Sequence, residues 1–598
     1  MMIDICKTFD KIMINNRLFG TRYSSRLTML EVIKNFSQYI TRGVEIILVG
    51  DTGVADRFLN VSDITKKTRY IIDPKTSGAV LNNATRKIRG TEVLSSNQVD
   101  DLQNVAYIVL DKNINKSIFN IIPENAKYII CVNDIMEING QDVLKEYLEW
   151  CIPYTTPHER IMFTWRLLKS SHGKLKRKYL EELIYKFLLI KDFDSAFSFI
   201  QQWKESEYDE KMVILDLENS LRKMINDISD SLKLRGDKND IIMVWNDAMR
   251  FDELSKLDFL GKEVEGNSLF FENAYTTVYD THGAFASIFN KRYQIDDYNR
   301  SDDDCDLDNS LLVNKLKEKG YVFISCFDYD FSDKSNTATM AIYDPGCLRF
   351  WNAIDFLIKN DSPVFLLIYE QAETHNPYHC PYMDKDYYFI RGCDPSDYQK
   401  QITLSSVYWD KQLKFYMSIL NYEKTTIYMS DHGKPLDIEE LCKPNPGYIE
   451  EYTHVVLEVQ NSNIGTKREG RIFSLINFIE LISYVLNPSY DNYEKMFDGY
   501  ALLQAIDRYN KGDIEKKLSD GAEKTNLMSY RAIRTEEDIF VLRGDGNRMY
   551  YQTSDMSVNE INNEKYTDRI KYLEDKTGDY FINIFEDDFF ENSRILYL

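Results

Sequence analysis

Short apolar runs alternate with helix-like stretches in the N-terminal part of the chain. The runs are VEIILVG at 44–50, RYIID at 69–73, VAYIVLD at 105–111 and KYIICVND at 127–134. Each has strand length and is rich in β-branched and aromatic residues. The alternation is typical of βαβ units, which build parallel sheets. We therefore expect a small parallel-sheet module over residues 1–138.

The apolar spacing then changes to three and four residues. The stretch EELIYKFLLIKDFDSAFSFIQQWKES at 181–206 keeps this spacing and breaks at Lys191 and Asp192. Such a pattern predicts two amphipathic helices in a hairpin. We expect a helical connector over residues 139–236.

Strand-like runs return at Asp240. DIIMVWND at 240–247, VFLLIY at 364–369 and TTIYMS at 425–430 are apolar runs of strand length. Continuous apolar runs of this kind suit strands that are buried on both faces of a sheet. The pattern predicts a larger α/β domain that begins near residue 237.

Composition narrows the classes of protein. The chain has 598 residues, so several domains are expected, and 73 basic against 95 acidic residues give a net charge of −22. This acidity argues against a general nucleic-acid or anionic-membrane binder. No apolar run could span a membrane, no secretory signal opens the sequence, and nine scattered cysteines form no C-x-x-C pair. We expect a cytoplasmic protein, and an oligomer is compatible with the sequence.

Part of a dinucleotide-binding pattern is present in the first module. Gly50 and Gly53 follow the first strand, and Asp73 ends the second. The third glycine of the pattern is missing. The module resembles small Rossmann-like domains fused to enzymes of surface-sugar metabolism, but we expect no NAD.

Two acids stand at the ends of apolar strands in the larger domain. Asp247 follows IIMVWN, and Asp431 follows TTIYMS with His432 directly after it. Ligands usually bind at the carboxyl ends of strands in α/β sheets. Carboxylate oxygens and an imidazole nitrogen together suit a divalent ion. The alternative is that Ser430, Asp431 and Gly433 only form a turn.

The histidines are concentrated in the same region, since five of the seven lie between His282 and His454. A single histidine usually packs in a core, whereas a group of this kind, with several beside Asp, Gly or Pro, indicates a site.

An ordered set of motifs resembles the alkaline phosphatase superfamily, in its sulfatase-like branch. The matching stretches are VWNDAMRFDEL at 244–254, LFFENAYTTVYDTHGAFASIFNKRY at 269–293, LKEKGYVFISCFD at 316–328, ETHNPYHCPY at 373–382, SSVYWDKQLKFYMSIL at 405–420, YMSDHG at 428–433, YTHVVLEV at 452–459 and YRAIRTEEDIFVLRGDGNRMYY at 530–551. The resemblance implies a mixed sheet flanked by helices over 237–525 and a small C-terminal α+β subdomain over 526–598.

The resemblance also implies site residues. Asp247, Asp431 and His432 would bind the metal, and Thr281 would be both a metal ligand and the nucleophile. Threonine is the nucleophile of the phosphoethanolamine transferases and lipoteichoic acid synthases that the motifs resemble. An alternative role for Thr281 is that of a helix N-cap. His375 and His454 would face the substrate as catalytic groups, or would bind a second metal.

The segment THGAF lacks the Cys, Pro and Arg of the sulfatases that form formylglycine. The resemblance therefore favours a metal-dependent phosphodiesterase or phosphotransferase acting on a phospho-substituted glycan or its precursor. The Asp–His pair favours Zn or Mn over Ca. The alternatives are a sulfatase acting on a sulfated glycan and a non-catalytic binding or scaffold protein. Neither nucleic acid nor a membrane span is expected.

Overall fold

The computed structural model describes residues 3–24, 27, 45–49, 68–72, 87–88, 91–94, 105–109, 128–131, 156–206, 211–262, 267–293, 307–326, 345–375, 378, 380–384, 395–434, 449–505, 530–543 and 547–577. The chain forms two compact units. The smaller comprises Cys6–Pro157 and Asp209–Leu221, and the larger comprises Met1–Ile5, His158–Tyr208 and Arg222–Leu598. The division into four segments that we expect from the sequence stays a prediction.

The smaller unit contains a six-stranded sheet. Its strands are β1 (Glu45–Val49), β2 (Thr68–Ile72), β3 (Lys87–Ile88), β4 (Thr91–Leu94), β5 (Val105–Val109) and β6 (Tyr128–Cys131), in the order β3-β4-β2-β1-β5-β6. All neighbours are parallel except β3 and β4. The four apolar runs therefore form parallel strands, as the sequence predicted. Gly50, Gly53 and Asp73 lie outside the described residues, so the Rossmann-like character of the module stays a prediction.

Two of the described helices have several residues in the smaller unit. They are α1 (Ile5–Asn15) and α10 (Lys211–Lys233), and α10 continues into the larger unit.

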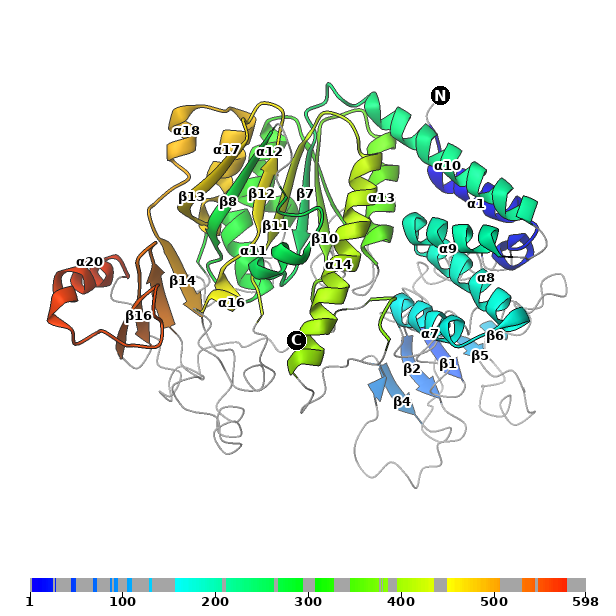
Figure 1. Ribbon diagram of the computed structural model, residues 1–598, viewed down its shortest axis with the longest axis horizontal. Helices are drawn as coiled ribbons and strands as arrows, with labels where there is room; N and C mark the ends of the chain where they lie inside the picture. Colours follow the sequence, from blue (N-terminus) through cyan, green and yellow to red (C-terminus); the bar gives the residue numbers. More distant parts are fainter. Residues whose placement is uncertain are drawn as a thin grey trace. The chain divides into compact units, whose positions relative to one another are not determined.

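A seven-stranded mixed sheet is the centre of the larger unit (Figure 1). Its strands are β7 (Ile241–Asn246), β8 (Ser268–Tyr275), β9 (Val322–Cys326), β10 (Val364–Glu370), β11 (Thr425–Ser430), β12 (Leu457–Gln460) and β13 (Lys467–Ser474), in the order β13-β8-β12-β11-β7-β10-β9. β9, β10, β7 and β11 are parallel, and β12 is antiparallel to both of its neighbours. The central strands β7, β10 and β11 are buried throughout, which explains their unbroken apolar sequences.

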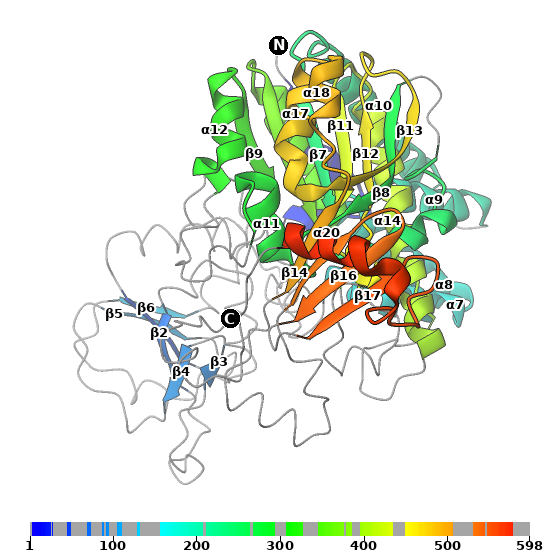
Figure 2. The same ribbon diagram turned by 90° about the vertical axis from the view of Figure 1, so that its left-hand side faces the viewer.

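Helices cover both faces of this sheet (Figures 1 and 2). One face packs Trp245 and its neighbours against α11 (Thr281–Asn290), α12 (Leu311–Glu318) and α17 (Phe478–Leu486). On this face the rings of Trp245 and Phe285 are stacked with centroids 4.4 Å apart. The other face carries α13 (Gly346–Lys359) and α14 (Pro395–Ile419), where Trp409 donates a hydrogen bond to Asn246. Shorter helical segments are η3 (Phe251–Lys256), η6 (Leu307–Asn309), α16 (Glu450–Thr453), η7 (Leu475–Asn477) and α18 (Tyr490–Glu494).

Three helices of the expected connector belong to the larger unit. They are α7 (Pro157–Lys169), α8 (Gly173–Leu189) and α9 (Phe193–Glu205), and α8 and α9 form the predicted hairpin. Buried polar contacts join them to the sheet domain. Tyr408 on α14 donates to Asp192, and His158 Nε2 lies 2.9 Å from Glu373 Oε1.

A second, four-stranded antiparallel sheet completes the larger unit (Figure 2). It consists of β14 (Ala501–Ala505), β15 (Tyr530–Arg534), β16 (Asp538–Arg543) and β17 (Arg548–Gln552), and η9 (Glu564–Tyr566) and α20 (Thr567–Thr577) follow it. One face packs against α20, and the other packs against Tyr275 and Ile472 of the mixed sheet. β14 lies before residue 526, so the sheet takes one strand from the segment that we assigned to the catalytic domain.

Candidate metal centre

The pairing of two parallel strands brings Asp247 and Asp431 together. β7 and β11 are neighbours, and Asn246 is paired with Ser430 at their carboxyl ends. The next residue on each strand is an aspartate, and both aspartates are fully buried. The expected convergence of the two acids is therefore present.

Asp247 is held from the neighbouring strand β10. Tyr369 donates its hydroxyl to Asp247 Oδ2 at 2.6 Å, and the Asp247 amide donates to the Glu370 carbonyl at 2.8 Å. Burial raises the pKa of the Asp247 carboxyl, but the nearby His375, His432 and Lys434 outweigh it and lower this pKa overall. Asp247 is therefore a buried carboxylate with one oxygen, Oδ1, that faces the site.

Asp431 keeps one oxygen without a hydrogen-bond partner among the described residues. Its Oδ1 accepts from the amides of Ala248 and His432, each at 3.0 Å, whereas Oδ2 is buried and has no such partner. Ala248 has φ = 57°, in the left-handed region, and this turn directs its amide toward Asp431. Burial and the charge of Asp247 raise the pKa of Asp431 to about 6. A bare, buried carboxylate oxygen of this kind suits a cation.

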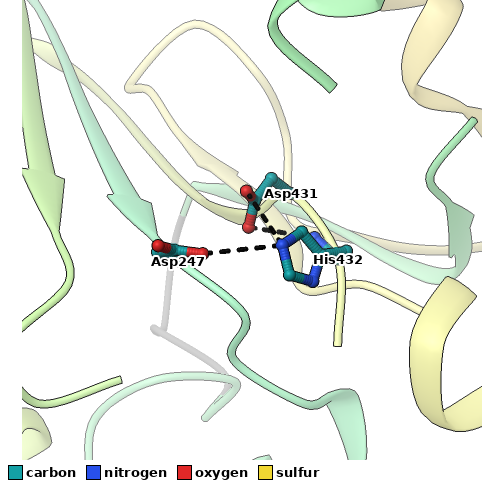
Figure 3. Close-up of side chains that lie close together, drawn as sticks. All are labelled: Asp247, Asp431 and His432. Atoms are coloured by element: carbon teal, nitrogen blue, oxygen red, sulfur yellow. Dashed lines mark hydrogen bonds and ion pairs between the residues drawn. The ribbon is translucent and has the colours of Figure 1, made fainter. Parts of the chain in front are cut away.

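The ring of His432 is oriented by the backbone. Its Nδ1 lies 2.9 Å from the Gly433 carbonyl and donates to it, which directs Nε2 toward the centre of the site. Nε2 lies 3.6 Å from Asp247 Oδ1 and 3.6 Å from Asp431 Oδ2 (Figure 3). In a neutral ring with its proton on Nδ1, the Nε2 lone pair would face both carboxylates and could bind a metal ion.

Asp247, Asp431 and His432 together can hold a divalent ion. One ligand atom from each lies within 4.8 Å of the others, and all three residues are buried. A cation would neutralise two carboxylates and occupy the position that Asp431 Oδ2 and His432 Nε2 both face. The chemistry of this donor set therefore fits a divalent metal ion.

Thr281 lies beside these three residues. Its Oγ1 donates to Asp247 Oδ1 at 3.3 Å and lies 3.3 Å from His432 Nε2. Thr281 is the first residue of α11, and Asp280 is the N-cap, since the Asp280 side chain accepts from the Gly283 amide at 2.9 Å. The alternative role of Thr281 as the helix cap is therefore wrong.

His375 is paired with a lysine that the sequence analysis did not single out. Lys434 Nζ donates to His375 Nε2 at 2.6 Å. Burial lowers the pKa of Lys434 to about 8, while Asp247 and Asp431 act in the opposite direction. The position of Lys434 directly after the SDHG motif is a signal that could have identified it.

His454 makes its contacts elsewhere. Its Nδ1 lies 3.2 Å from Glu450 Oε2, its Nε2 donates to the Glu272 carbonyl at 2.8 Å, and its ring stacks on Phe251 with centroids 3.8 Å apart. Within the described part of the chain, none of its hydrogen bonds, ion pairs or ring contacts reaches Asp247, Thr281 or His432. The structure does not bring His454 to this cluster, so its catalytic role stays a prediction without a supporting contact.

Asn246, the last residue of β7, directly precedes Asp247 and is buried. Its side chain donates to the Met429 carbonyl at 3.1 Å and accepts from Trp409 Nε1 at 2.7 Å. These contacts tie β7 to β11 and α14, so Asn246 supports the sheet.

Of the other histidines in this region, His379 lies outside the described residues.

Comparisons with known proteins give structural matches alone. No protein-family model and no curated relative matches the sequence. Similar solved structures include a phosphonate monoester hydrolase of Agrobacterium radiobacter, with 12% identity, a TM-score of 0.42, and coverage of 56% of this chain and 94% of that chain. A 2-O GAG sulfatase matches with 11% identity, a TM-score of 0.42, and coverage of 56% of this chain and 90% of that chain.

A third similar structure is a protein in the alkaline phosphatase superfamily from Vibrio parahaemolyticus, with 13% identity, a TM-score of 0.34, and coverage of 54% of this chain and 87% of that chain. These proteins are of the kinds that the sequence motifs resemble. Among the described residues, no helix is long and apolar enough to cross a membrane.

Proposed function

We propose that this chain is a sulfatase-like, metal-dependent enzyme that cleaves phosphoric diesters with Thr281 as its nucleophile. The observation that supports this most directly is the position of the Thr281 hydroxyl, 3.3 Å from both Asp247 Oδ1 and His432 Nε2. A hydroxyl next to metal ligands is placed for activation as a nucleophile. The glycan or glycan-precursor substrate that the sequence motifs imply is part of this proposal.

Asp247, Asp431 and His432 would hold the metal. A bound divalent ion lowers the pKa of a neighbouring hydroxyl and stabilises the charge of a phosphoryl group. Zn or Mn fits this set better than Ca, because Ca takes six to eight oxygen ligands and the set includes an imidazole nitrogen.

In the first half-reaction, Thr281 Oγ1 forms a bond to phosphorus and the bond between phosphorus and one alcohol oxygen breaks. The Thr281 proton leaves to solvent, and Asp247 Oδ1, which would hold the metal, accepts the hydrogen bond that orients the hydroxyl. The departing alkoxide takes a proton from the hydrogen-bonded pair of Lys434 and His375. The amides at the N-terminus of α11 favour the phosphoryl anion beside Thr281.

In the second half-reaction, water or a sugar hydroxyl forms a bond to phosphorus and the bond to Thr281 Oγ1 breaks. The attacking hydroxyl loses its proton to the Lys434–His375 pair, and Thr281 recovers a proton from solvent. This returns every group to its starting state, and the choice of attacking group decides between hydrolysis and transfer.

The proposal is tested with purified protein, Mn²⁺ or Zn²⁺, and two chromogenic esters. Bis-p-nitrophenyl phosphate should release nitrophenol, and p-nitrophenyl sulfate should not. Thr281→Ala should lower the rate by about 10³-fold or more, while Thr281→Ser should keep part of it because the hydroxyl remains. Thr403→Ala, at an α14 threonine bonded to Glu253, is the matched control and should leave the rate unchanged.

Mass spectrometry of enzyme quenched during turnover should find a phosphoryl adduct on the peptide that contains Thr281. Full activity in Thr281→Ala would instead show that water attacks directly. Cleavage of the sulfate ester in preference to the phosphate diester would favour the sulfatase alternative. No turnover of either ester by the metal-loaded protein would leave the binding or scaffold alternative in place.

A further inference from the structure

The segment that contains α16 is hydrogen-bonded to the turn that carries Asp431 and His432. Tyr452 O accepts from the Gly433 amide at 2.8 Å, and Val456 O accepts from the Ser430 amide at 3.0 Å. A Cβ atom on Gly433 would lie 2.1 Å from Glu451 O, so only glycine allows α16 to approach this closely. The metal-binding turn is therefore packed directly against α16.

The same segment contacts the other two parts of the chain that form the site. Thr453 O accepts from the Thr276 amide at 3.0 Å, five residues before Thr281. Val455 forms a β-bridge with Arg250, three residues after Asp247. Residues 450–456 thus connect, through the backbone, to every segment that supplies a metal ligand or the proposed nucleophile.

The position of α16 is fixed by an ion pair from the second sheet. Arg534, at the end of β15, contacts Glu450 Oε1 through its guanidinium, and its side chain is 7% exposed. The guanidinium also lies over the Tyr275 ring, 4.4 Å from its centroid. The other oxygen of Glu450 contacts His454 Nδ1 at 3.2 Å. Both carboxylate oxygens of Glu450 are therefore engaged, one by Arg534 of the second sheet and the other by His454, which directly follows α16.

We propose that Arg534 and Glu450 are positioning residues for the metal centre, through which the second sheet holds α16 and so sets the spacing of Asp247, Asp431 and His432. His454 belongs to this arrangement, because it orients Glu450 and does not contact the cluster itself. The inference rests on the proposed metal centre, and it gives the second sheet a role in metal affinity as well as in stability.

The test compares Arg534→Met, Glu450→Gln and the double variant by calorimetry with Mn²⁺ alone. Each single change should weaken metal binding by about tenfold, the range seen when groups that orient metal ligands are removed. The double variant should be no worse than either single one, since both remove the same contact. The exchanged pair Arg534→Glu with Glu450→Arg should recover part of the affinity.

Arg569→Met is the matched control. Arg569, on α20, pairs with Asp538 at the start of β16 at 2.7 Å and does not touch α16 among the described contacts. This change should lower stability without changing the affinity for Mn²⁺. If Arg569→Met and Arg534→Met weaken metal binding equally, or if neither does, the inference is wrong.

Amide hydrogen exchange of the metal-free protein separates this inference from the proposed function. Exchange in the peptide 428–434 should rise in Arg534→Met and Glu450→Gln but not in Arg569→Met. If wild-type protein binds no Mn²⁺, the proposed metal centre is wrong. The exchange measurement would still show whether Arg534 and Glu450 position the segment 428–434. Unchanged exchange at 428–434 in Arg534→Met would overturn it.

Discussion

The candidate site depends on which atom of each side chain is left to face the centre. For Asp431 it is Oδ2, because two backbone amides occupy Oδ1. For Asp247 it is Oδ1, because Tyr369 occupies Oδ2. For His432 it is Nε2, because Nδ1 donates to Gly433 O. Neighbouring groups thus leave three donor atoms facing one point.

At the N-terminus of α11, Asp280 is expected to contribute to stability as the helix cap, and Thr281 is expected to contribute to the chemistry. Because Asp280 accepts from the Gly283 amide, Asp280→Ala should lower the free energy of unfolding by about 1 kcal/mol. Thr281→Ala should change it by less than about 0.5 kcal/mol, since Thr281 does not cap the helix. Urea denaturation of the metal-free variants measures both. A larger loss in Thr281→Ala than in Asp280→Ala would contradict this assignment.

Single elements are joined by buried polar groups at their ends. Asp192 caps α9 by accepting from the Ser195 amide, and it also accepts from the Tyr408 hydroxyl on α14 at 2.8 Å. Burial raises the pKa of Asp192 to about 6, although both hydrogen bonds act in the opposite direction. The contact between the helical hairpin and α14 therefore includes a carboxyl group that burial favours in its protonated form.

The raised pKa of Asp192 predicts how the free energy of unfolding changes with pH. Between pH 4 and pH 6 the folded state holds a proton on Asp192 that the unfolded state has lost, so the free energy of unfolding falls as pH rises. This group alone contributes up to about 3 kcal/mol to that fall. Asp192→Asn keeps a helix N-cap and a hydrogen-bond acceptor, but its side chain does not titrate. The free energy of unfolding of the wild type, relative to that of Asp192→Asn, should therefore be higher at pH 4.5 than at pH 7.5.

Urea denaturation at the two pH values measures this difference. Asp194→Asn is the control, because Asp194 is near Asp192 but is 32% exposed and pairs with Lys411. A difference between wild type and Asp192→Asn that does not change with pH would contradict the shifted pKa of Asp192.

On the scale of the whole molecule, the larger unit combines the mixed sheet, the second sheet and the helices α7 to α9, and the candidate site lies within it. Two buried aspartates lie close together there, and the burial of Asp431 beside Asp247 disfavours its ionised form. A bound cation would remove this conflict, so metal binding and the stability of the larger unit should be coupled.

Removal of metal should therefore lower the unfolding transition of the larger unit. At a metal concentration of 100 times Kd, the stabilisation should be about 3 kcal/mol. Calorimetry with Mn²⁺ and then with excess chelator measures the change, and the transition of the smaller unit is the internal control. Asp431→Asn should abolish the metal-dependent shift and raise the stability of the metal-free protein, because it removes a buried charge. A shift that persists in Asp431→Asn would place the metal elsewhere.

Local sequence determined much of this protein. The apolar runs at 44–50, 240–246, 364–369 and 425–430 identified strands, because burial on both faces demands unbroken apolar sequence. The acids that follow β7 and β11 identified the candidate site, because parallel neighbours end at the same edge of a sheet. These features depend on a few consecutive residues, which is why pattern alone was sufficient.

The partners of individual side chains were decided by the tertiary structure. His375 and His454 look alike in sequence, yet the first pairs with Lys434 and the second with Glu450. The sequence of the helical hairpin predicts a connector, yet in the structure the hairpin packs on α14 through Asp192. The contacts of His375 with Lys434 and of Asp192 with α14 join segments that are distant in sequence. The contact of His454 with Glu450 is local, because the two residues are one helical turn apart. A one-dimensional pattern carries no information on which distant segment will pack there, so only the assembled fold determines these partners.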